Sequence, residues 1–199
     1  MAFRFIDDLM DKNKKYFSPY FNHLQSELIS LNRNYMAAQM EVFPEKKFFP
    51  DANSTLRVAF GNVKGYTARD AVDYSWFTTL DGVMQKLDSS TNDYKVPQHE
   101  IDLWKKKDYG IYADKDGTLH TCFIAANHTT GGNSGSPVLD KNGNLIGTNF
   151  DRVWEGTMSD INFDSSRCRN ISLDVRYTLW IIDKFAGASY LLKEMKLIN

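Results

Sequence analysis

The sequence predicts a mainly β domain with accompanying helices, preceded by a helical arm. Apolar residues recur at helical spacing as far as about residue 42, and beyond two prolines the chain changes to short alternating segments separated by Gly and Asn turns. A Gly- and Ser-rich loop at residues 130–137 is followed by two strand-like segments joined by an Asn-Gly turn. With 199 residues, of which 42% are hydrophobic, the chain is long and apolar enough to bury a core.

The arm is predicted from apolar residues that fall on one side of a helix. These residues are Phe5, Leu9, Tyr16, Tyr20, Leu24, Leu28, Leu31, Tyr35 and Met40. Pro19 starts or kinks a second helix, and Pro44 with Pro50 ends the region. A helix pair with so much apolar surface needs a partner, either the rest of a larger protein or a second copy.

After Pro50 the pattern becomes that of a sheet. Residues 54–61 (STLRVAFG) alternate as a half-buried strand does, and Gly and Asn turns follow them. Further strand-like segments lie at 110–112, 122–125, 138–139, 145–147 and 170–173. Helices are expected at 79–87 and 97–107, and two short helices are expected to pack on the sheet at 177–185 and 190–197.

Charge is nearly balanced, with 24 basic and 25 acidic side chains and a net charge of -1. Because no overall field attracts phosphate groups, we expect no nucleic acid and no membrane surface as partner. No apolar run approaches the roughly 20 residues of a membrane span, and the chain contains no export signal. Cys122 and Cys168 match no zinc spacing, and two buried thiols are favoured over a single bridge. We expect neither a metal nor another cofactor.

Residues 130–137 (TGGNSGSP) are typical of a loop that presents a nucleophilic serine. Glycines on both sides of Ser134 allow a sharp turn, and the surrounding backbone N–H groups can converge on a developing oxyanion. The loop leads into a strand, an Asn-Gly turn at 141–144 and a second strand. The nucleophile elbow of an α/β-hydrolase runs from a strand into a helix instead. The sequence therefore favours a chymotrypsin-like β-barrel.

A serine nucleophile needs a histidine to take its proton and a carboxylate to orient that histidine. His128 lies six residues before Ser134, but the residues between them must form the oxyanion loop. His120 is interpreted as a surface or strand-edge histidine, and His23 and His99 as solvated. In double-barrel proteases the histidine and aspartate come from the preceding barrel. The chain is therefore expected to be the C-terminal piece of a larger enzyme, inactive by itself.

Several motifs together resemble one known family. They are 129–137 (TTGGNSGSP), 147–156 (GTNFDRVWEG), 174–177 (DVRY), 181–185 (IIDKF) with Gly187, and 49–57 (FPDANSTLR). They resemble the C-terminal region of bacterial dipeptidyl peptidases 7 and 11, over nearly the whole chain. The resemblance implies that residues 1–45 are the tail of a helical cap domain. It implies that residues 46–199 are the second barrel of a chymotrypsin-like peptidase with terminal helices.

The same resemblance implies an activity and a setting. Enzymes of this family are serine exopeptidases that release dipeptides from oligopeptides with a free N-terminus. By resemblance Ser134 is the acylated nucleophile, and the backbone N–H groups of Gly132 and Ser134 form the oxyanion hole. The resemblance further implies a periplasmic or secreted enzyme that works as a homodimer.

Three consecutive residues carry substrate recognition in this resemblance. Asp151 and the carbonyl group of Phe150 would hold the α-ammonium group of the peptide, and a solvated turn aspartate is the alternative for Asp151. Arg152 falls in the S1 pocket, where the acidic-specific enzymes carry arginine and the hydrophobic-specific ones glycine. A guanidinium there favours Asp or Glu as the second residue of the substrate, as in dipeptidyl peptidase 11. The alternative for Arg152 is a surface pair with Glu155.

Two other function classes stay open. One is a non-catalytic, protease-like binding module, because the chain offers no credible histidine and aspartate pair. The other is a self-sufficient endopeptidase that uses His128 or His120 as its base.

Overall fold

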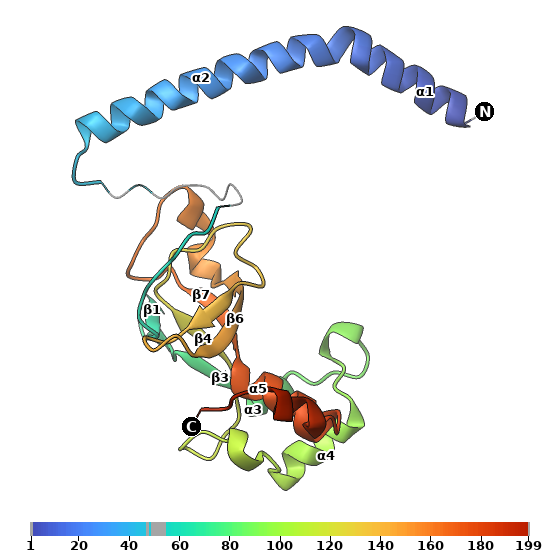
Figure 1. The fold of residues 1–199 in the computed structure, drawn as a ribbon, viewed down its shortest axis with the longest axis vertical. Coiled ribbons are helices and arrows are strands. Elements are labelled where there is room, and N and C mark those ends of the chain that lie inside the picture. Colours follow the sequence, from blue (N-terminus) through green and yellow to red (C-terminus); the bar gives the residue numbers. More distant parts are fainter. Residues whose placement is uncertain (1, 47, 49–54, 199) are drawn as a thin grey trace. The chain divides into compact units, whose positions relative to one another are not determined.

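The computed structural model describes residues 2–46, 48 and 55–198. The chain divides into two units, Met1–Asp51 and Ala52–Asn199 (Figure 1). Pro50 and most of the motif at 49–57 lie outside the described residues.

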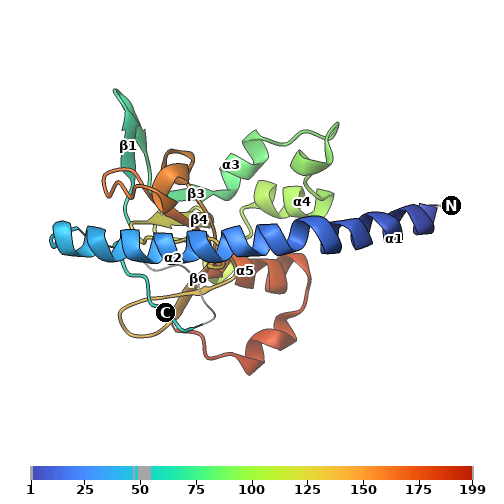
Figure 2. The same ribbon diagram turned by 90° about the horizontal axis from the view of Figure 1, so that it is seen from above.

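The first unit is a helical arm, as predicted. It consists of α1 (Ala2–Lys12), a π-helical turn η1 (Asn13–Phe17) and α2 (Ser18–Val42), which run on without interruption (Figure 2). Pro19 lies in the first turn of α2, directly after the π-helical turn. The helix ends at Val42, just before Pro44.

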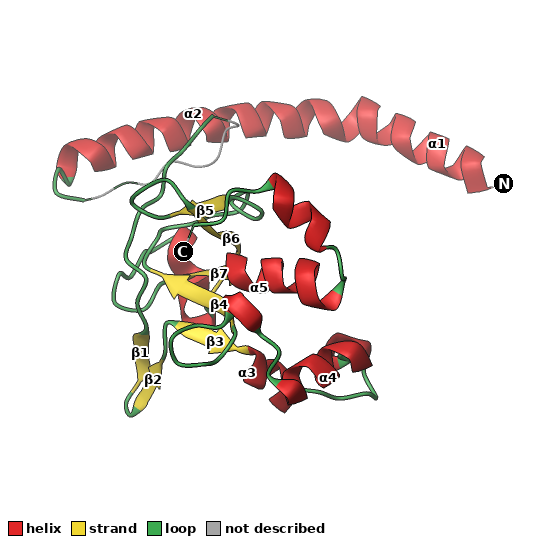
Figure 3. Cartoon of the chain, turned by 60° about the horizontal axis from the view of Figure 1, so that its bottom comes forward, coloured by secondary structure: helices red, strands yellow, loops and turns green. Residues whose placement is uncertain are grey.

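The second unit is a mixed α/β structure with antiparallel sheets (Figure 3). A five-stranded sheet has the order β3-β4-β7-β6-β5, and a separate pair is formed by β1 and β2. The strands are β1 (Tyr66–Arg69), β2 (Val72–Tyr74), β3 (Phe77–Thr79), β4 (His120–Ala125), β5 (Pro137–Leu139), β6 (Leu145–Arg152) and β7 (Asn170–Asp174). Sequence patterning finds β4 to β7 and misses β1, β2 and β3.

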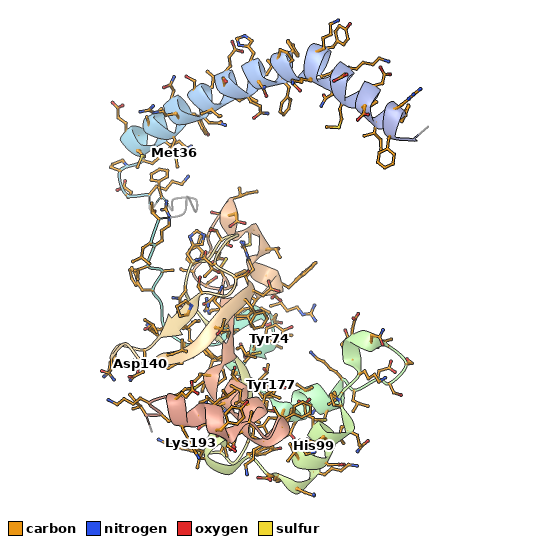
Figure 4. The ribbon with its side chains drawn as sticks, turned by 45° about the vertical axis from the view of Figure 1, so that its right-hand side comes forward. Met36, Tyr74, His99, Asp140, Tyr177 and Lys193 are labelled. Atoms are coloured by element: carbon orange, nitrogen blue, oxygen red, sulfur yellow. The ribbon has the colours of Figure 1, made fainter. Side chains whose placement is uncertain are left out.

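Helices gather at one end of this unit and form its apolar core. They are α3 (Leu80–Gln85), η2 (Asn92–Tyr94), α4 (Gln98–Lys106), η3 (Gly110–Tyr112), α5 (Val175–Trp180), the π-helical turn η5 (Ile181–Phe185) and η6 (Ser189–Glu194). Leu80, Leu103 and Trp180 bring α3, α4 and α5 together in one buried cluster. Tyr177 of α5 lies in this helical end (Figure 4), where its hydroxyl donates to Glu100 at 2.9 Å.

Two predicted strands are wrong. Residues 110–112 form the 3-10 helix η3, because Gly110 takes a φ of 55° that extended backbone does not use. Described residues 55–61 of the predicted strand 54–61 are irregular. Leu56, Val58 and Phe60 there are exposed. Alternation alone does not make a strand when no neighbouring strand supplies hydrogen bonds.

The contact between β6 and β7 positions the candidate site. Gly147 lets β6 approach closely, since a Cβ atom there would lie 2.5 Å from the Leu173 carbonyl oxygen. Further along, the register shifts so that Asn149 pairs with Ser172 and Asp151 with Ile171. Phe150 is therefore the extra residue of a β-bulge, a feature that bends a strand and re-aims the residues after it.

Candidate active site

The loop around Ser134 is folded by its own backbone. The N–H of Asn133 donates to the Thr130 carbonyl at 3.2 Å, and the Asn133 side chain accepts from the Thr130 N–H at 2.8 Å. Gly132 and Gly135 have φ values of 98° and 83°, in the left-handed region that side chains disfavour. Gly132 and Gly135 thus allow the sharp turn around Ser134, as the sequence predicts.

The loop is tied to β6 beside it. The N–H of Gly135 donates to the Asn149 carbonyl at 2.7 Å, and the N–H of Asn149 donates to the Ser136 carbonyl at 2.9 Å. The Ser134 side chain is exposed, and its Oγ donates to the Phe150 carbonyl oxygen at 3.2 Å. The structure therefore brings Ser134 and the bulge residue Phe150 together.

Below the loop runs a ladder of buried polar side chains. The Asn149 Nδ2 atom donates to the Asn133 carbonyl at 3.1 Å, and Asn170 Nδ2 donates to Asn149 Oδ1 at 2.9 Å and to Ser172 Oγ at 3.2 Å. Asn149, Asn170 and Ser172 are 5%, 2% and 0% exposed. Sequence reasoning misses these residues. Asn170, inside the predicted strand 170–173, is a signal that could have found them, because asparagine is depleted in strands.

Arg152 lies at the end of β6 with its side chain 20% exposed. Its Nη1 atom donates to Ser159 Oγ at 2.6 Å, and its Nη2 atom pairs with Asp160 Oδ2 at 3.0 Å. Both partners belong to the 3-10 helix η4 (Trp154–Asp160), which sequence patterning does not predict. The guanidinium is thus partly desolvated and already faces one carboxylate.

The pairing of Arg152 with Glu155, the alternative from the sequence, is wrong. Glu155 instead accepts a hydrogen bond from the Tyr66 hydroxyl at 2.6 Å. Burial, and secondarily this carboxylate, raise the pKa of Tyr66 well above its usual value. The Glu155 side chain therefore links η4 to β1 through Tyr66.

Asp151 and Phe150 sit between the serine and the arginine in the chain. Asp151 is exposed, and its Oδ1 atom accepts from the Arg152 N–H at 2.8 Å. The Phe150 side chain is 45% exposed. The Asp151 carboxylate and the Phe150 carbonyl, which accepts from Ser134, are consecutive acceptors of a kind that suits an ammonium group.

In the described part of the chain, the hydrogen bond from Ser134 Oγ goes to the Phe150 carbonyl and not to a histidine. His128 Nε2 lies 3.1 Å from the Ser159 carbonyl, so this histidine contacts the helix that holds Arg152. His23 pairs with Glu27 in the arm. His99 is exposed on α4, as expected.

The interpretation of His120 as a surface or strand-edge histidine is wrong. The residue is 3% exposed and stacks on Phe77 with ring centroids 3.9 Å apart. Its two ring nitrogens lie 3.4 Å from Asp114 and 3.2 Å from Asp116. The turn before β4 folds back over the ring, which no pattern within the strand could reveal.

Charge stabilises this turn. Arg176 donates to Asp114 at 2.6 Å, and this bond is the main cause that lowers the pKa of Asp114. The backbone and side chain of Thr118 donate to Asp116 and, with His120, lower the pKa of Asp116 to about 2.

Cys122 and Cys168 are free thiols. No helix in the described part of the chain is long and apolar enough to cross a membrane. Over the same residues, no cluster of three or more His, Cys, Asp or Glu side chains is arranged to hold a metal ion.

An exposed serine on a glycine-rich loop, bonded to a strand that ends in a partly buried arginine, suits a peptidase. The chain belongs to the peptidase S46 family, whose model matches residues 1–197. The family resemblance predicted from the sequence is confirmed.

Individual relatives are similar along the same stretch. The chain is 52% identical over 198 residues to an Asp/Glu-specific dipeptidyl-peptidase of Flavobacterium psychrophilum, covering 100% of this chain and 28% of that protein. It is 44% identical over 169 residues to a dipeptidyl-peptidase 7 of Phocaeicola vulgatus, covering 85% of this chain and 23% of that protein. A crystal structure of Porphyromonas endodontalis DPP11 in complex with substrate matches with a TM-score of 0.87 and 42% identity, over 96% of this chain and 28% of that one. The chain thus spans under a third of the length of these relatives.

Proposed function

We propose that this chain carries the nucleophile of a serine-type dipeptidyl peptidase that releases N-terminal dipeptides with Asp or Glu as their second residue. The observation that carries the proposal is the placement of Ser134 against β6, the strand that ends in Arg152. Relatives at 52% identity named Asp/Glu-specific dipeptidyl-peptidases support the acidic preference.

The chemistry proposed for Ser134 is acyl transfer. Its Oγ attacks the carbonyl carbon of the second residue, and the N–H groups of Gly132 and Ser134 stabilise the oxyanion. A histidine takes the Oγ proton and passes it to the departing amine as the C–N bond breaks. Water then attacks the acyl group, which regenerates the hydroxyl and releases the dipeptide. The bond to the Phe150 carbonyl holds the hydroxyl at rest and has to break first.

The proposed binding residues contact two groups of the dipeptide, its α-ammonium group and the side chain of its second residue. Asp151 and the Phe150 carbonyl hold the α-ammonium group, which lets an exopeptidase distinguish a free N-terminus from an internal amide. Arg152 binds the acidic side chain through its planar fork. An apolar side chain there would leave the guanidinium without that partner.

The histidine and aspartate are proposed to belong to a part of the protein upstream of this chain. The larger size of the relatives supports this, since the chain covers 28% of their length. In this proposal residues 46–199 are the second barrel of a chymotrypsin-like fold and residues 1–45 the end of a helical cap. The complete enzyme is proposed to be a periplasmic or secreted homodimer, and the isolated chain to be inactive.

Ser134→Ala in the complete protein tests the function. We expect hydrolysis of a fluorogenic Leu-Asp substrate to fall by about three or more powers of ten, since loss of the nucleophile removes the acyl step. Ser136→Ala, in the same loop, is the matched control and should retain activity. Full turnover by the Ser134 variant would reject the assignment.

Labelling with a serine-directed phosphonate distinguishes a serine peptidase from a non-catalytic binding module. Covalent labelling of Ser134 in the complete protein but not in the 199-residue chain supports the split triad. No labelling in either form would favour a non-catalytic binding module. Labelling of the chain alone would implicate its own histidines.

A further inference from the structure

The carbonyl group of Asn133 is held from two directions. It accepts from the Ser136 N–H at 3.0 Å and from the Asn149 Nδ2 at 3.1 Å. The second donor is a side chain of β6 that is 5% exposed. The carbonyl is therefore fastened towards the buried interior of the sheet.

The same peptide group supplies the N–H of Ser134. In a planar trans peptide the C=O and N–H bonds point in opposite directions. A carbonyl fixed towards Asn149 therefore turns the Ser134 N–H away from the sheet. In the described part of the chain this N–H makes no hydrogen bond, although the neighbouring N–H groups of Asn133 and Gly135 do. A donor that is rigidly aimed and unoccupied is what a developing oxyanion requires.

Asn149 is itself oriented by a second asparagine. Its Oδ1 atom accepts from Asn170 at 2.9 Å, so its Nδ2 atom must face Asn133. Asn170 is 2% exposed, and its own Oδ1 atom is buried without a hydrogen-bond partner among the described residues. An unsatisfied buried acceptor destabilises a fold, and apolar residues of similar size in such a place can be neutral or stabilising. The ladder is thus poorly explained by stability alone.

We propose that Asn149 is a positioning residue that aims the Ser134 N–H as an oxyanion donor, and that Asn170 fixes the orientation of the Asn149 amide. The inference rests on the proposed function, because it gives the ladder a role in the step at Ser134. Its effect is on the transition state, since the oxyanion forms only there.

Asn149→Leu in the complete protein removes the donor and keeps a similar volume. We expect kcat on Leu-Asp substrate to fall about 10- to 100-fold with KM unchanged, less than the loss of a whole oxyanion donor. Inhibition by a dipeptide aldehyde, whose adduct carries the oxyanion, should weaken in proportion, while binding of the product dipeptide should not change. Thr148→Ala, at an exposed position of β6 next to Asn149 and outside the ladder, is the matched control and should behave as wild type.

Asn170→Leu is the second variant, which guards against misfolding of the first. It leaves the Asn149 donor in place but frees its amide to rotate, so a smaller loss of kcat with an unchanged or higher Tm is expected. Wild-type kcat in both folded variants, or a change confined to KM, overturns the inference.

A crystal structure of Asn149→Leu tests the same point without activity. The Asn133–Ser134 peptide should be rotated or disordered. An unchanged peptide overturns the inference whatever the kinetics, whereas an inactive wild-type protein would reject only the proposed function.

Discussion

The loop of Ser134 packs on β6, and Arg152 is the last residue of that strand. The loop is held by neutral hydrogen bonds, whereas the Arg152 side chain is held by an ion pair. The loop is fixed by neutral amides, with Asn149 and Asn170 almost fully buried. Arg152 is held by an ion pair to Asp160, whose side chain is 51% exposed. Neutral buried hydrogen bonds respond little to pH and salt, whereas a half-exposed ion pair responds to both. In the proposed function, the geometry of the nucleophile loop would thus respond little to pH and salt, whereas the position of the substrate-binding arginine would respond to both.

The β-bulge at Phe150 lies between the residue that supports the loop, Asn149, and the charged residues at the end of β6. Asn149, on one side of it, pairs with Ser172 and is buried, whereas Asp151, on the other side, is exposed. A strand without the extra residue would keep strict alternation of its two faces. One inserted residue therefore lets β6 support the loop from inside and present charged groups outside.

The largest effect on the charged side is expected for Arg152→Gly in the complete protein. Loss of a charge-assisted, two-point contact should lower kcat/KM for a Leu-Asp substrate about 100-fold. Hydrolysis of a Leu-Leu substrate should rise at the same time, because an apolar side chain would no longer face a guanidinium with which it cannot pair. Parallel kinetics on the two substrates measure both changes.

Arg152→Lys sharpens that result. It keeps the charge but lacks the planar fork, so its kcat/KM should fall between those of the wild type and Arg152→Gly. An unchanged substrate profile in the glycine variant would remove Arg152 from the S1 pocket.

A smaller effect is expected for Asp160→Asn. Asp160 and an acidic substrate side chain would share the same guanidinium, so removing the resident charge should lower KM for Leu-Asp about two- to fivefold, the range for an exposed pair. The gain should shrink at high salt. Glu155→Gln is the control, because that carboxylate contacts Tyr66 and not Arg152. A higher KM would mean that Asp160 orients Arg152 for substrate instead of competing with it.

The features that can be predicted from the sequence are those determined by residues a few positions apart in the chain. The turn around Ser134 depends on glycines inside the loop and on a contact between Thr130 and Asn133, three residues apart. The arm follows from helical spacing, and the hairpin after the loop from Gly143, whose φ is 83°. Asp140 accepts from two N–H groups of that same turn.

The features that cannot be predicted in this way depend on register and on distant partners. The role of Asn149 appears only when β6 is aligned with β7 and the bulge is placed. His120 is covered by Phe77, which lies on β3, far from it in sequence. The alternating residues 55–61 carry a strand pattern, but a pattern does not supply a neighbouring strand.

The smallest effect is expected at the turn before β4, a third region, which charge also stabilises. The folded-state pKa of Asp116 is about 2, below the value of about 4 for an unfolded chain. Its carboxylate therefore stabilises the fold above about pH 4, and this contribution disappears as the pH falls towards 2. Asp116→Asn should lower the Tm at pH 6 and leave it equal to wild type near pH 2. Asp70→Asn, at an exposed turn, is the control, and a Tm difference that persists at pH 2 would show that Asp116 acts through shape instead of charge.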